Sequence, residues 1–274
     1  MVTDWDLRLI KNMEDPLEEL RSQLLKTIST KTSDWKEKVY DSQQYQQELT
    51  FLRDMTYDFV NSLRSVAFYS TRAGDIYVNF LTIHAIDDLL QSAIGILSMV
   101  ENGIYNPVKR ELRYLLEMMT KFVIVDYDKT GEILTAKTEY LNAEIPNSSI
   151  EIIDNYNPPF KEEKNKEFKN EVKDFFYKSC AYVHPSKKQV DEQIRNYKNR
   201  NNIGFESAKM FGTTNKLIFR AYDMILTMIF HGFGLSMSGD LFIQLFDENS
   251  KWKFHKGKYV RELSKLFDYK SERK

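Results

Sequence analysis

Three polar residues, Arg113, Glu117 and His184, are the strongest candidates for chemistry in this chain. Arg113 and Glu117 stand one helical turn apart in the segment YNPVKRELRYLLEMMTKFVIVDYD, whose second half is apolar on every side. We therefore expect the pair to lie where the helix face becomes buried. A buried arginine–glutamate pair is kept for a specific role more often than for stability. The alternative is an ordinary salt bridge on a solvent-exposed face, worth about 0.3 kcal/mol.

The histidine closes a second segment, SCAYVHPS, and precedes Pro185, which disfavours helical geometry in the residue before it. At a helix C-terminus the helix dipole favours the imidazolium, and the ring can cap free carbonyl groups. The functional alternative makes His184 a general acid or base, or a ligand contact, close to Arg113 and Glu117. Cys180 lies one turn earlier, and we expect it to be a packed thiol rather than a nucleophile.

A polar stripe interrupts the apolar segment between residues 76 and 100. At 100° per residue its members fall within about 100° of one another on a helix. They are His84, Asp87, Asp88, Gln91 and Gly95. A metal site needs three or four converging ligands and one helix presents only two well, so we expect a hydrated or hydrogen-bonded stripe and no metal. The sequence has no glycine-rich phosphate loop, paired-cysteine motif, nucleophile elbow or HExxH motif, and we expect no cofactor.

Basic residues gather at the C-terminal end, where residues 250–274 hold nine Lys and Arg against three Asp and Glu. The candidate nucleic-acid-binding residues are Lys251, Lys253, Lys256 and Lys258. They alternate with the aromatic residues Trp252, Phe254, Tyr259, Phe267 and Tyr269. Cations beside exposed rings suit single-stranded nucleic acid, through phosphate neutralisation and base stacking. The alternative is that VRELSKLF forms a last amphipathic helix docked on an acidic bundle, with its rings in the core.

Helices must position all of these residues, and we expect an all-α, multi-helix bundle with no substantial sheet. Residues 1–73 contain one proline and no glycine, a composition typical of long helices. Asp15 and Pro16 begin the first helix, along which Leu17, Leu20, Leu24 and Ile28 form an apolar stripe. Residues 30–33 are predicted as a turn, followed by a second helix from Asp34 to about Thr71. The two helices would form an antiparallel hairpin that packs on the core or on a second subunit.

The rest of the chain also follows a helical pattern. Gly74 and Asp75 begin a predicted helix over residues 76–100, which is nearly apolar all round and is therefore expected at the centre of the bundle. Residues 217–237 are long and apolar enough to raise the question of a membrane span. Arg220, Asp223 and His231 interrupt them, so we expect a buried core helix, with Arg220 and Asp223 paired, and no membrane partner.

The composition limits the class of protein. The chain has 274 residues, of which 42% are hydrophobic, and a formal net charge of -1. Its single cysteine excludes an internal disulfide, and its N-terminus is acidic where a signal peptide would be basic, so we expect a cytoplasmic protein. We divide it into an N-terminal helical hairpin (1–73) and a helical bundle with a basic tail (74–274), with a single compact domain as the alternative.

The motifs NPVKRELRYLLE and SCAYVHPS resemble those of an uncharacterised group of bacterial all-helical proteins, distantly similar to HEPN domains. HEPN domains are helical bundles of toxin and abortive-infection (phage-defence) systems, and many are ribonucleases. The resemblance covers about residues 76–246. Catalytic HEPN domains place an arginine and a polar residue four to six positions before a histidine. In this chain Lys178 stands at that place before His184, and a lysine lacks the planar guanidinium fork.

Two hypotheses follow. In the first, a HEPN-like protein binds RNA, with ribonuclease activity as an extension, through Arg113, Glu117 and His184 and with the basic tail as its electrostatic footprint. In the second, the chain is a non-enzymatic interaction module that forms a homo-oligomer through its N-terminal helices.

Overall fold

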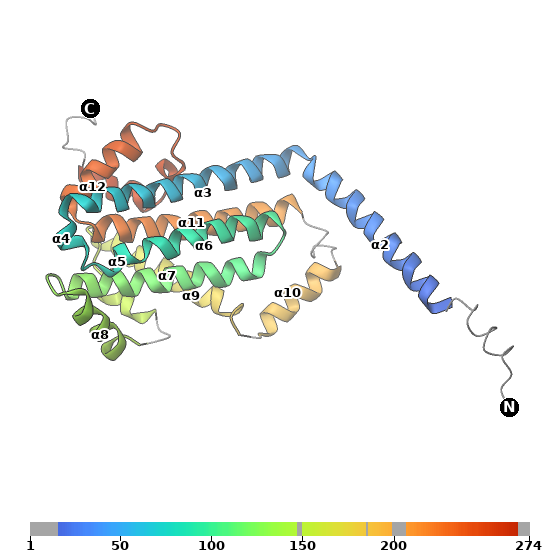
Figure 1. The fold of residues 1–274 in the computed structure, drawn as a ribbon, viewed down its shortest axis with the longest axis horizontal. Coiled ribbons are helices and arrows are strands. Elements are labelled where there is room, and N and C mark those ends of the chain that lie inside the picture. The colour runs from blue at the N-terminus through green and yellow to red at the C-terminus, as the bar shows by residue number, and fades with distance from the viewer. Residues whose placement is uncertain (1–15, 147–149, 185, 199–206, 268–274) are drawn as a thin grey trace, which may run out of the picture.

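The computed structural model describes residues 16–146, 150–184, 186–198 and 207–267 of the chain. These residues form an all-α bundle and contain no strand, as predicted (Figure 1). The helices are α2 (Pro16–Tyr40), α3 (Gln43–Ser70), α4 (Gly74–Tyr77), α5 (Leu81–His84), α6 (Ile86–Glu101), α7 (Tyr105–Asp128), α8 (Leu134–Glu144), α9 (Glu162–Cys180), α10 (Lys187–Lys198), α11 (Ala208–Gly232), α12 (Leu235–Phe242) and α13 (Val260–Ser264). Short 3-10 turns and one π-helical turn, Ile243–Asp247, connect them.

The core is built around α11, which packs against both α7 and α3. Every residue from Ala221 to Phe230 is buried, which confirms the predicted core helix as far as Gly232. The predicted segment then breaks at Gly234, and α12 begins at Leu235. Tyr222 stacks on Phe59 of α3 with ring centroids 3.8 Å apart. An apolar run that long without an exposed face can only be satisfied at the centre of a bundle.

The predicted helix over residues 76–100 is wrong in two respects. The chain breaks it into α4, α5 and α6, because the buried carboxylate of Asp126 accepts hydrogen bonds from the backbone N–H groups of Leu81 and Thr82 and so begins a new helix there. The segment is also not central. Its longest part, α6, leaves Ile94 61% exposed, and α11 takes the central place instead.

The predicted N-terminal hairpin is also wrong. Residues 30–33 lie inside α2, and the helix ends only at Asp41–Ser42, where the Ser42 hydroxyl caps α3 by accepting a hydrogen bond from the N–H of Tyr45. Thr30 does not break α2, because its hydroxyl donates to the carbonyl of Lys26 within the helix. Instead of folding back along α3, α2 projects away from the bundle (Figure 1).

The two N-terminal helices therefore have different surroundings. Leu52 and Leu63 of α3 are fully buried and share one core with α6 and α11, so no separation appears at residue 73. On α2, Leu20, Leu24 and Leu25 are 53%, 54% and 60% exposed. The predicted stripe also contains Leu17 and Ile28, whose side chains are outside the described part of the chain.

One described segment, Leu81–Glu101, is long and apolar enough to span a membrane by length and composition. A third of it is buried inside the bundle. Core helices of globular proteins meet the same criterion, so this property alone decides nothing about a membrane.

Candidate functional site

Arg113 and Glu117 form a largely buried pair on α7, with 13% of each side chain exposed and 3.5 Å between Arg113 Nη2 and Glu117 Oε2. Lys121, one turn further on, reaches the other oxygen of Glu117 at 2.7 Å. The Arg113 guanidinium lies 4.3 Å from the ring centroid of Phe176 on α9, and its Nε is buried without a hydrogen-bond partner among the described residues. One carboxylate thus pairs with two cations.

These three side chains line a cavity of about 460 Å³ between α6, α7 and α8. Asp88 stands on its α6 side and Leu141 on its α8 side. The cavity holds two cationic and two anionic groups, so it favours no single sign of ligand charge.

The structure does not bring His184 to this pair. The residue of α9 that Arg113 contacts is Phe176, two turns before His184, and His184 is exposed beyond the end of the helix. Within the described residues, no hydrogen bond or ion pair joins His184 to Arg113 or Glu117. The neighbouring Ser179 is buried, and Cys180 is a half-buried free thiol.

The polar stripe around His84 is bonded locally. His84 Nε2 lies 2.8 Å from the carbonyl oxygen of Val78, and Gln91 donates to Asp87 at 2.7 Å. Nowhere in the described part of the chain do three or more His, Cys, Asp or Glu side chains gather closely enough to hold a metal ion.

The C-terminal segment presents its lysines and its rings to different surroundings. The rings of Trp252, Phe254, Tyr259 and Phe267 are all buried, so the docked-helix alternative is confirmed and these rings offer no stacking platform; Tyr269 lies outside the described residues. Two of the four candidate lysines are engaged by the bundle, Lys253 with Asp54 and Lys258 with Glu167 and Glu171. The other two, Lys251 and Lys256, are exposed.

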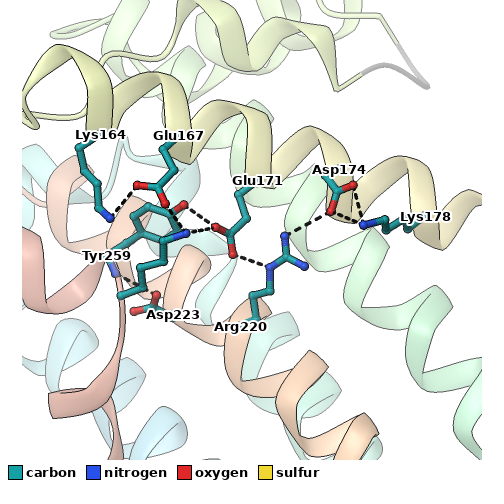
Figure 2. Close-up of polar contacts among 9 residues, drawn as sticks. Lys164, Glu167, Glu171, Asp174, Lys178, Arg220, Asp223 and Tyr259 are labelled. Atoms are coloured by element: carbon teal, nitrogen blue, oxygen red, sulfur yellow. Dashed lines mark hydrogen bonds and ion pairs between the residues drawn. The ribbon is translucent and has the colours of Figure 1, made fainter.

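Figure 2 shows how α9 fastens the C-terminal segment to α11. The carboxylate of Glu171 accepts hydrogen bonds from Arg220, from Lys258 at 2.5 Å and from the Tyr259 hydroxyl at 2.6 Å. Burial pushes the pKa of Glu171 up, but these hydrogen bonds outweigh it, so its pKa lies below the ordinary value. Burial and the hydrogen bond to Glu171 raise the pKa of Tyr259. The network keeps Glu171 ionised and holds the basic segment in place.

Asp223 does not pair with Arg220, which corrects the expectation. Arg220 reaches Glu171 and Asp174 on α9, whereas the 3% exposed Asp223 accepts the N–H groups of Tyr259 and Val260, each at 3.0 Å. Asp223 therefore caps α13. Burial raises its pKa to about 6 despite these hydrogen bonds.

A second buried carboxylate, Asp126, is the polar centre that sequence reasoning missed. It accepts hydrogen bonds from the start of α5 and from the fully buried Lys137, whose Nζ lies 3.0 Å away. The Lys137 ammonium also lies 4.3 Å from the centroid of the Phe80 ring. An available signal was the position of Asp126 directly after the apolar run from Phe122 to Val125.

A cavity of about 930 Å³ lies between the start of α7, α10 and the start of α11. Glu192 attaches α10 at its edge, since it accepts hydrogen bonds from Lys109 at 2.9 Å and from the Tyr182 hydroxyl at 2.5 Å. Neither the Arg113 pair nor His184 lines this cavity.

Comparison of the chain with models of known protein families, with characterised proteins and with solved structures finds no match. The HEPN-like resemblance therefore stays a prediction, and function must be argued from the geometry alone.

Proposed function

We propose that this chain is a helical interaction protein that self-associates through α2. The observation that carries the proposal is the exposure of Leu20, Leu24 and Leu25 on a helix that projects from the bundle (Figure 1). Fully burying one leucine contributes about 1.5–3 kcal/mol, so a surface that covers all three would gain several kcal/mol.

The form of α2 supports a helical partner. Leu20 and Leu24 are one turn apart and share a face, and Leu25 flanks it. With 25 residues, α2 is about 37 Å long, which gives two such helices an extended seam. In proteins most of the stability of a helix comes from packing of its apolar face, so a partner would also stabilise α2 itself.

Charge supports a second copy in antiparallel orientation. The first turn of α2 carries Glu18 and Glu19, whereas its last turn carries Lys38 beside Glu37 and has no net charge. Two antiparallel copies would keep the two acidic starts apart and place each beside the Lys38 end of the other copy. A parallel pair would instead place like charges together, which costs free energy.

Retention of an untagged copy of the full chain by a tagged copy bound to a resin tests the proposal. Untagged wild type should be retained by tagged wild type, and the Leu20→Glu, Leu24→Glu double variant should not, because two carboxylates would be buried in the seam. The matched control is Thr30→Glu with Ser33→Glu, which adds the same charge on the face of α2 opposite all three leucines. Equal retention of all three proteins would refute self-association through α2.

RNA binding is a second proposal, extended from the HEPN-like resemblance. The observation that favours it is that Lys251, Lys256 and Arg261 are exposed on the C-terminal segment and pair with no carboxylate in the described part of the chain. These cations are available to phosphates, whereas Lys253 and Lys258 are not.

Filter retention of labelled single-stranded RNA at increasing salt tests this second proposal. Replacing Lys251, Lys256 and Arg261 with glutamine should weaken retention and flatten its dependence on salt, because fewer phosphates are neutralised. The same number of replacements at the exposed Lys26, Lys161 and Lys166 is the control. Absence of retention by the wild-type chain at low salt would exclude RNA binding.

A further inference from the structure

The cavity of about 930 Å³ lies at the end of the bundle from which α2 departs (Figure 1). Its volume falls within the range of sites that enclose small molecules, about 300–1,000 Å³. Neither proposed function uses it.

The floor of this cavity is apolar. Ile104 and Pro107 at the start of α7 and Met210 and Leu217 of α11 are among the residues that line it. On the α10 side stands Tyr197, which is 76% exposed and offers an aromatic face to an occupant. An apolar floor with an aromatic wall suits a ligand with an apolar or aromatic body.

The charges around the cavity are strongly unequal, with four cationic side chains and a single carboxylate among its lining residues. Glu192 engages Lys109, and Glu171 engages Arg220 from outside the cavity. Lys209 and Lys216 are exposed and pair with no carboxylate among the described residues. They lie seven residues apart, two helical turns on the same face of α11, so both ammonium groups can reach one occupant.

The start of α7 adds to this positive potential, because the positive end of its helix dipole borders the cavity that Ile104 lines.

We propose that this cavity binds a small organic anion, with an apolar or aromatic body against the floor and a carboxylate, sulfonate or phosphate group near Lys209 and Lys216. The site is separate from α2 and from the Arg113 pair. The shared chemistry fits both an acyl carboxylate and a nucleoside monophosphate.

Fluorescence titration of the full chain with 8-anilinonaphthalene-1-sulfonate, an aromatic anion, tests the proposal. The Lys209→Glu, Lys216→Glu double variant should bind the dye about tenfold or more weakly, since charge-assisted contacts are lost. The control, Lys161→Glu with Lys166→Glu, makes the same change in net charge at exposed positions near the start of α9, away from both α2 and the cavity, and should leave the affinity unchanged. Equal weakening by both variants, weakening by the control alone, or no weakening by either would overturn the proposal.

Displacement of the bound dye distinguishes the two sources of the anion. Displacement by decanoate identifies an acyl carboxylate, and displacement by adenosine monophosphate identifies a nucleotide; either result supports the site. Displacement by inorganic phosphate alone, by a single-stranded oligoribonucleotide alone, or by none of these ligands contradicts a site for a small organic anion.

Discussion

The leucines of α2 and those of the bundle have opposite surroundings. Leu112, Leu115 and Leu116 on α7 are fully buried, whereas Leu20 and Leu24 on α2 are more than half exposed. The bundle also buries two carboxylates, Asp126 and Asp223, together with the groups that donate hydrogen bonds to them. The bundle thus buries its apolar side chains and pairs these carboxylates within one chain, whereas α2 exposes leucines that no described residue covers.

The largest expected effect breaks a polar centre of the bundle. Asp126→Ala removes the partner of the fully buried Lys137 and the cap of α5, and should lower the free energy of unfolding by about 3–5 kcal/mol. Urea denaturation followed by circular dichroism measures it. The control Asp128→Ala changes an exposed carboxylate two residues away and should cost less than about 0.5 kcal/mol. Equal costs would mean that the buried pair is not a stabilising centre.

The next comparison sets one leucine of the bundle against one of α2. Leu112→Ala should cost about 2–5 kcal/mol, because it leaves a cavity in the core. Leu24→Ala should change the unfolding free energy by less than about 0.5 kcal/mol when measured at low protein concentration. A large cost at Leu24 under these conditions would show that α2 packs on its own bundle.

The dependence of stability on pH separates two buried groups. Burial lowers the pKa of His231 from its ordinary 6.5 to about 4, so its contribution is complete above pH 6.5 and is lost as the pH falls from 6.5 to 4. Burial raises the pKa of Asp223 from 3.8 to about 6, so its contribution has the opposite sign: acid stabilises the fold between pH 6 and 3.8. In the wild-type chain the two effects largely cancel.

Single variants should expose them. His231→Asn should cost roughly 2 kcal/mol less at pH 4.5 than at pH 7.5, and Asp223→Asn roughly 2 kcal/mol more, as about 1.4 kcal/mol per unit of pKa shift requires. Urea denaturation at both pH values measures each difference. The same sign for both variants would contradict these assignments.

The smallest effect concerns a close approach between backbone and carboxylate. A Cβ atom on Gly257 would lie 2.3 Å from Asp223 Oδ1, so Gly257→Ala should displace the cap of α13 and cost about 1–3 kcal/mol. Gly95 on α6 has nothing within 4 Å of such an atom, and Gly95→Ala should stabilise the chain by roughly 0.5–1 kcal/mol. Thermal unfolding of both variants measures the contrast. A neutral Gly257→Ala would show that Asp223 can move away.

Local chemistry made some features of the fold predictable. Pro16 begins α2 as expected, and Arg113 and Glu117 lie one turn apart on α7 as expected; Gly103 adopts a positive φ in the turn before this helix. Proline and glycine restrict or free the backbone at their own positions, so a single sequence carries that information. The burial of α11 followed in the same way from its long apolar run.

Features set by distant partners were not predictable. The break before Leu81 depends on Asp126, 45 residues away, and Lys137 gives no sign in the sequence that it is buried. Asp223 is close to Arg220 in the sequence, but Arg220 pairs instead with Glu171 and Asp174 of α9. Arg113 and Glu117 lie on one helix, so their spacing in the sequence predicts the pair. The position of His184 relative to them depends on contacts between helices, which the sequence does not show.

Sedimentation equilibrium of the full chain tests the central claim most directly. We predict the mass of two chains at micromolar concentration, a reversible shift towards one chain on dilution, and the mass of one chain for the Leu20→Glu, Leu24→Glu variant at every concentration. A wild-type chain that stays at the mass of one chain at high micromolar concentration would contradict self-association through α2.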